Sequence, residues 1–156
     1  MQKDAISQGL TALAFDFFYW FSRFEFALKE NKYLENKVPG AAALPGWQAF
    51  VNQWHSAYQV SNEARAILGA SPEQQFVEAN GELAWRPVNL DNCKSDLARL
   101  VRLLQTVRNN LFHGGKHGGA GWDNPARTEL LLKAGIEVLG ELASLAGIEA
   151  DYVQIY

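Results

Sequence analysis

An arginine and a histidine in the second half of the chain offer the clearest chemistry in this sequence. Arg108 is followed at once by the polar residue Asn109 and, five positions after the arginine, by His113. A histidine exchanges protons near neutral pH, and the planar, permanently charged guanidinium of an arginine matches phosphate geometry. Together they suffice for metal-free attack of an RNA 2′-hydroxyl on its own phosphate. The histidine would move the proton, and the arginine would stabilise charge on the phosphoryl oxygens.

A helix must position this pair, because apolar residues recur every three or four positions before it. The stripe consists of Leu90, Cys93, Leu97, Leu100, Leu104, Val107 and Leu111. It predicts a helix over residues 90–113, which Gly114 and Gly115 end. Arg108 lies within about 40° of the middle of the stripe. We therefore expect Arg108 either to be paired inside the fold or to face a groove in which a ligand is its partner.

The opposite side of the same helix carries a polar row. It consists of Arg102, Thr106, Asn109 and His113. On a regular helix Arg108 and His113 are about 140° apart, so their side chains diverge. Either the helix end unwinds at Gly114 and Gly115, or two copies of the motif meet across a two-fold axis and complete each other. Without chemistry, His113 would only complement the helix dipole, and Arg108 would form a structural salt bridge.

The first predicted helix, over residues 5–34, is apolar on two sides. Its main stripe contains Leu10, Leu13, Phe17, Trp20, Phe24 and Leu28, and Phe15, Tyr19 and Phe26 lie nearly opposite. Such a helix is buried on both sides, either centrally in a bundle or in a subunit interface. Glu25 flanks the main stripe. It either forms a surface ion pair with Lys29, four positions later, or is the acid that pairs with Arg108.

The remaining elements are predicted from apolar periodicity and turn residues. A second amphipathic helix begins at Trp47 and reaches residues 64–68 with a break. Asn80 and Gly81 stand between two short runs, which predicts a tight hairpin that Pro87 ends. The last long helix opens with Pro125.

Gly147 is the predicted cap of this last helix, and residues 148–156 are expected to dock back on the bundle. The predicted fold is all-α. It is an up-and-down bundle of four to five helices with a small β-hairpin insertion, in a single domain spanning residues 1–156.

Composition narrows the class of protein. The chain has 156 residues and a formal net charge of −3, which argues against non-specific coating of nucleic acid. Between residues 90 and 127, however, six basic residues outnumber three acidic ones. The one cysteine, Cys93, permits no intrachain disulfide and favours a reducing compartment. We expect a soluble cytoplasmic protein, because we find neither a secretory pattern nor a membrane helix.

The common cofactor and metal motifs are not found in the sequence. It has no phosphate-binding loop, dinucleotide fingerprint, HExxH or CxxC motif, and its histidines and cysteine are not spaced as metal ligands. We therefore predict no cofactor and no metal. The catalytic candidates are Arg108, Asn109 and His113. The candidates for supporting or substrate-binding roles are Glu25, Arg102, Lys116 and His117, the last two in the glycine-rich loop of residues 114–124.

The motif resembles that of the HEPN superfamily (higher eukaryotes and prokaryotes nucleotide-binding). The signature of that family is an arginine, a polar residue directly after it, and a histidine four to six positions beyond the arginine, late in a long helix. Arg108, Asn109 and His113 fit these places, and residues 108–114 as a whole look like the usual sequence of the motif. Residues 21–29 are also similar to the aromatic-rich first helix of many members.

The resemblance implies an all-α bundle that forms a homodimer, with the two motif helices building a shared cleft. Many members are metal-independent endoribonucleases of toxin–antitoxin, phage-defence or RNA-processing systems, and an antitoxin or a nucleotidyltransferase is an expected partner. Carried over, Arg108 and His113 are the catalytic pair, Asn109 supports them, and Glu25 is an acid that some branches keep.

Two other interpretations of the sequence involve no catalysis. Some members keep the fold and act as nucleotide- or partner-binding dimerisation modules. In a purely structural dimer, Glu25 would fully neutralise Arg108.

Overall fold

The computed structural model describes residues 8–113 and 124–154 of the chain. Over these residues the fold is mainly α-helical and includes one small antiparallel sheet, as predicted. The elements in chain order are α1 (Gln8–Glu30), α2 (Trp47–Trp54), α3 (Asn62–Ala70), β1 (Glu73–Val77), β2 (Leu83–Pro87), α4 (Asp96–His113), α5 (Pro125–Ala146) and α6 (Glu149–Val153). The described ranges thus hold six helices, more than the four to five predicted.

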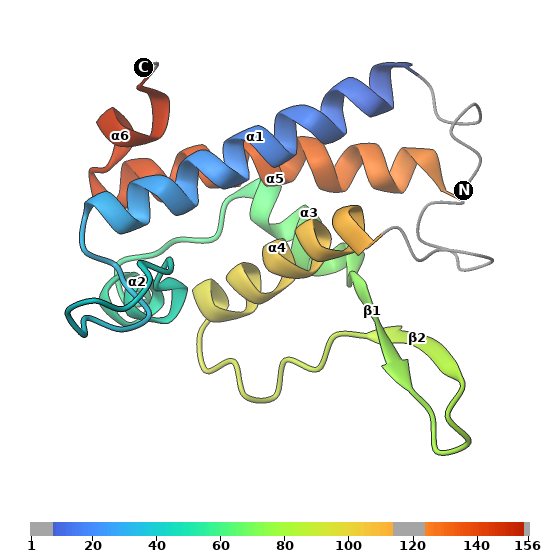
Figure 1. Ribbon diagram of the computed structural model, residues 1–156. Helices are drawn as coiled ribbons and strands as arrows, with labels where there is room; N and C mark the ends of the chain where they lie inside the picture. The colour runs from blue at the N-terminus through green and yellow to red at the C-terminus, as the bar shows by residue number, and fades with distance from the viewer. Residues whose placement is uncertain (1–7, 114–123, 155–156) are drawn as a thin grey trace.

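The two longest helices, α1 and α5, lie side by side, and α4 runs beneath them in the opposite direction (Figure 1). The core between them is filled by large side chains, among them Phe17, Phe21 and Phe24 of α1, all at most 1% exposed. The predicted stripe of α4 faces this core, with Leu97, Leu100 and Leu104 fully buried and Val107 7% exposed. Burying such side chains is the main source of stability in the fold.

The second predicted helix is divided into α2 and α3. The division follows from Ser61, whose Oγ accepts a hydrogen bond from the backbone N–H of Ala64 and so starts α3 as a new helix. The C-terminal tail forms α6, which packs against α1 with Tyr152 6% exposed. The described part of the tail thus docks on the bundle, as expected. The division of the second predicted helix and the formation of α6 account for the higher number of helices.

The predicted hairpin is present, but its turn is longer than predicted. Phe76 faces Ala84 and Val77 faces Leu83, and Glu78 donates its backbone N–H to the carbonyl of Glu82. Three residues, 79–81, remain in the turn, and Gly81 adopts φ +83°. A three-residue turn with glycine in the left-handed region is the usual alternative to the two-residue turn.

Two predicted helix boundaries were wrong. The motif helix starts at Asp96 rather than near residue 90, because the Oγ of Ser95 accepts from the backbone N–H of Ala98 and caps it. The first helix ends at Glu30 rather than at residue 34. There Lys32 adopts φ +65°, and the N–H of Tyr33 bonds back to the carbonyl of Leu28, which closes the helix.

Both predicted ends of the last long helix are confirmed. The side chain of Asn124 accepts from the N–H of Arg127 at 3.0 Å, Pro125 occupies the first turn, and Gly147 ends the helix at φ +66°. Within the described ranges, no helix is long and apolar enough to cross a membrane.

The contact between α1 and α5 depends on Gly135. A Cβ built at this position would lie 2.5 Å from the ring of Phe17, whereas a Cβ at Gly140, on the same helix, meets nothing within 4 Å. We predict that Gly135→Ala lowers the free energy of unfolding by about 1–2 kcal/mol through overpacking. Gly140→Ala, the matched control, should raise it by about 0.5–1 kcal/mol through helix propensity. Urea denaturation measures both, and equal effects of the two substitutions would contradict the tight packing.

Candidate functional site

Arg108 lies in the second-last turn of α4, where the helix faces α1. One guanidinium nitrogen is 3.4 Å from Oε1 of Glu25 in α1, and another donates to Oδ1 of Asn109 at 2.9 Å. The guanidinium carbon also lies 5.2 Å from the ring centre of Phe21 and 6.0 Å from that of Phe112, within the range of cation–π attraction. The Arg108 side chain is 31% exposed, so it is paired inside the fold and still reaches solvent.

Glu25 is the acid that pairs with Arg108, as one of the two interpretations of the sequence held. Its Oε1 also accepts a hydrogen bond of 2.9 Å from the indole N–H of Trp47, at the start of α2. An ion pair with Lys29 is not among those that the described residues form. Trp47 therefore helps to hold the carboxylate in place, and the carboxylate and Asn109 hold the guanidinium.

Two of the five N–H groups of Arg108 are used by described residues. The two acceptors are the carboxylate of Glu25 in α1 and the side-chain amide of Asn109 in α4. Together they fix the plane of the guanidinium. A planar guanidinium with further donors can bind two oxygens of one phosphate. The arrangement is thus suited to binding a phosphate without losing its support.

The histidine of the motif is placed only by its backbone. His113 is the last residue of α4, and its side chain lies outside the described part of the structure. The helix continues to that residue. Gly114 and Gly115, at which the helix end was expected to unwind under one of the two alternatives, lie outside the described residues. The positions of Arg108 and His113 on the helix are about 140° apart around its axis. Lys116 and His117 lie outside the described residues, as does the loop of residues 114–123.

Arg102 does not join Arg108. Its guanidinium donates to Oε1 of Gln74 in β1 at 2.8 Å, while Asn110, further along α4, donates to the carbonyl of Glu73 at 2.8 Å. These two bonds attach the hairpin to α4. The polar row that was expected to include Arg102 is also interrupted by burial, because Thr106 is only 2% exposed and bonds back to the helix backbone.

Trp47 was not among the residues expected at the site. In the sequence it looks like a core residue of an amphipathic helix, and it is indeed 7% exposed. The signal that points to a further role is general: a buried indole N–H needs an acceptor. Which acceptor it finds depends on how α2 meets α1, and helical periodicity does not determine this.

Metal ligands do not gather in the part of the chain that the structure describes. Over residues 8–113 and 124–154, no group of three or more His, Cys, Asp or Glu side chains could hold a metal ion. When the chain is compared with family models, with curated proteins and with solved structures, nothing matches it.

The exposure of the Arg108–Glu25 pair predicts its contribution to stability. Both side chains are partly exposed, at 31% and 23%, and the distance of 3.4 Å is long for an ion pair. We expect Arg108→Ala to lower the free energy of unfolding by about 1 kcal/mol, near the upper end for exposed pairs. Arg99→Ala, on the same helix, is the control, because its pair with Asp96 is about half exposed and should contribute less.

Urea denaturation of both variants decides between two roles. A loss of about 3–5 kcal/mol in Arg108→Ala would indicate a buried pair whose function is structural. A small loss leaves Arg108 available for a ligand.

Proposed function

We propose that this chain is a metal-independent endoribonuclease of the HEPN type that acts as a homodimer in the cytoplasm. The observation that carries the proposal is the partly exposed Arg108, held by Glu25 and Asn109 in the helix that ends at His113. The residue types fit cleavage of RNA by its own 2′-hydroxyl, and the resemblance of residues 108–114 to the family motif supports the same reaction.

The proposed reaction needs one base, one acid and one cation. His113 takes the proton of the 2′-hydroxyl, whose oxygen forms a bond to the adjacent phosphorus while the bond to the 5′-oxygen breaks. Arg108 stabilises the negative charge on the non-bridging oxygens. A protonated histidine, His113 of the second copy, returns a proton to the departing 5′-oxygen. The products are a 2′,3′-cyclic phosphate and a 5′-hydroxyl.

A second copy is suggested by an aromatic patch, which we define as Phe15, Phe18, Tyr19 and Phe112. These side chains are 66%, 40%, 40% and 57% exposed, and the rings of Phe18 and Phe112 meet at 4.9 Å. Phe15 and Tyr19 were expected to be buried in a bundle or in an interface, and the described residues leave both exposed. An exposed cluster of large apolar side chains is typical of a protein interface.

The position of the patch also fits the geometry of the reaction. Phe112 belongs to the patch and lies under the guanidinium of Arg108. Pairing two copies through the patch would bring both motif helices to one cleft. This arrangement would let the His113 of each copy work with the Arg108 of the other. The separation of about 140° between the two residues on one regular helix would then no longer keep them from acting together.

The resemblance further suggests a setting in toxin–antitoxin or phage defence. A nuclease of this kind has to be controlled, and an antitoxin or a nucleotidyltransferase would provide that control. The alternative function is a nucleotide- or partner-binding dimerisation module without catalysis. The ion pair with Glu25 instead favours the purely structural dimer, in which the charge of Arg108 is neutralised within the fold.

RNA cleavage in the presence of EDTA tests the proposal. The wild type should release products with 2′,3′-cyclic phosphate ends, whereas His113→Ala and Arg108→Ala should each slow cleavage by about a hundredfold or more. Arg99→Ala removes an exposed arginine from the same helix and should cleave like the wild type. Electrophoresis and mass spectrometry of the products give rate and end chemistry. Cleavage that persists in His113→Ala, or that requires a divalent metal, would falsify the mechanism.

The oligomeric state tests the role of the aromatic patch. We expect the wild type to be a dimer and Phe15→Glu to shift it to monomer, because a buried charge without a partner opposes association. Val77→Glu is the matched control, since Val77 is a 73% exposed apolar residue on the hairpin, outside the patch. Size-exclusion chromatography with light scattering measures the mass. A wild type that cleaves RNA as a monomer would contradict the shared site.

A further inference from the structure

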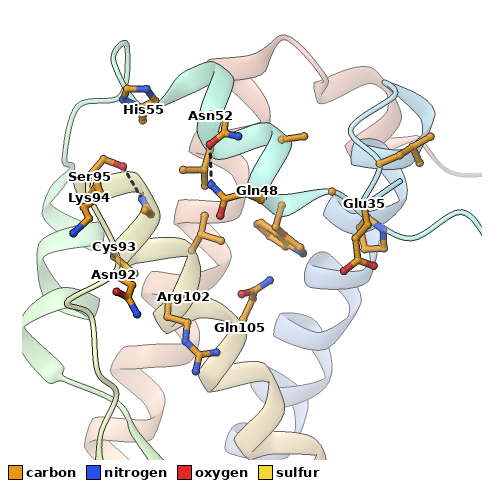
Figure 2. A pocket seen from close by; sticks show the side chains of 18 residues that line it. Glu35, Gln48, Asn52, His55, Asn92, Cys93, Lys94, Ser95, Arg102 and Gln105 are labelled. Atoms are coloured by element: carbon orange, nitrogen blue, oxygen red, sulfur yellow. Dashed lines mark hydrogen bonds between the residues drawn. The ribbon is translucent and has the colours of Figure 1, made fainter. Parts of the chain in front are cut away.

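A hollow of about 740 Å³ lies between α2 and the N-terminal half of α4. Figure 2 shows Gln48 and Asn52 of α2 and Arg102 and Gln105 of α4 around the same space. Its volume is within the range of small-molecule sites in proteins. None of the residues that line it is a catalytic candidate, and only Arg102 was expected to bind substrate.

The lining of the hollow combines amides with cations. Gln48 donates its side-chain amide to Oδ1 of Asn52 at 2.8 Å. This bond orients both groups and leaves the oxygen of Gln48 and the nitrogen of Asn52 as a neighbouring acceptor and donor. Gln105 adds a third amide from the other wall. A donor beside an acceptor is the pattern that base edges present, and glutamine and asparagine are the side chains that match it.

The charges of the hollow are of the sign that a phosphate needs. Lys94 and Arg102 line it, and the one acidic residue of the lining is Glu35. The local balance is positive although the chain as a whole carries a net charge of −3. The apolar part of the wall includes Val51 and Val101. A base and its phosphate would thus meet an apolar wall, amides and cations within one space.

The lining of the hollow on α4 ends at Gln105, one helical turn before Arg108. Gln105 precedes Arg108 by three positions and therefore lies on nearly the same face of α4, about 5 Å along the helix axis. Trp47 provides a second connection, because it lines the hollow and its indole N–H bonds to Glu25, the partner of Arg108. A strand with one phosphate at Arg108 would place an adjacent nucleotide at the hollow.

We propose that the hollow binds a nucleotide of the RNA substrate next to the cleaved phosphate and selects its base. This proposal rests on the proposed function. The amides of Gln48, Asn52 and Gln105 recognise the base, and Lys94 and Arg102 bind phosphate. The hollow is thus the part of the protein that gives the nuclease its sequence preference.

Cys93 provides a built-in reporter for this site. It is the one cysteine of the chain, it is half-buried, and it lines the hollow. An occupant of the hollow must slow the reaction of its thiol with a small alkylating reagent. The probe is a mixed-sequence RNA oligonucleotide with 2′-fluoro in place of every 2′-hydroxyl, which binds but provides no nucleophile for cleavage.

The experiment measures alkylation of Cys93 by intact mass, as the concentration of this oligonucleotide rises. Saturable protection is expected in the wild-type chain. Gln105→Leu should shift the protecting concentration about tenfold upward, because one amide contact to a base is lost. Lys94→Ala should reduce the dependence of log affinity on log salt by about 0.7. Lys133→Ala, on α5 and outside the hollow, is the control and should change neither value.

Two outcomes would overturn the proposal. In the first, fluorescence anisotropy shows that the oligonucleotide binds while Cys93 stays as reactive as in the free protein. In the second, nucleoside monophosphates protect Cys93 at concentrations as low as the oligonucleotide, which would identify a site for a free nucleotide. Because the probe is not cleaved, protection is read independently of catalysis. An inactive protein with protected Cys93 would refute the nuclease and retain the nucleotide site.

Discussion

A positive charge on the packed face of α4 is the constraint that governs this structure. A guanidinium that is only 31% exposed must be compensated, because desolvating a charge without a partner is costly. The compensation comes from three elements: Glu25 of α1, Trp47 of α2 through its bond to that acid, and Asn109 of α4 itself. The Arg108 side chain therefore links α1, α2 and α4 at the edge of the core that holds them together.

The same pairing is compatible with ligand binding because it is weak. A contact of 3.4 Å between partly exposed groups gains little beyond the cost of ordering them. A phosphate can form shorter, bidentate bonds with the guanidinium. Under the proposed function, Glu25 would hold Arg108 in the free protein, and Asn109 and the rings of Phe21 and Phe112 would maintain the plane of the guanidinium on a bound phosphate.

The elements that could be predicted from the sequence are those that depend on apolar periodicity and on capping residues nearby in the chain. The buried stripe of α4, both ends of α5 and the hairpin follow from spacing and from residues such as Asn124 and Gly147. The predicted start of α4 was too early because the apolar pattern continues upstream of the cap. The sequence alone does not show that the backbone N–H of Ala98 bonds to the side chain of Ser95. The bond of Trp47 to Glu25 and the hollow depend on how α2 meets α1 and α4, and a single helix carries no information on that.

Three regions with different proposed roles follow one another along α4. Its first half borders the hollow, Arg108 comes next, and Phe112 of the aromatic patch lies beyond it. In Figure 1, α2 lies near the start of α4, and α4 ends beneath the first halves of α1 and α5, away from α2. A dimer formed through the patch would therefore leave the hollow open to solvent. RNA could approach each Arg108 along α4 from the side away from the interface, so that association of two copies completes the reactive groups without closing the path of the substrate.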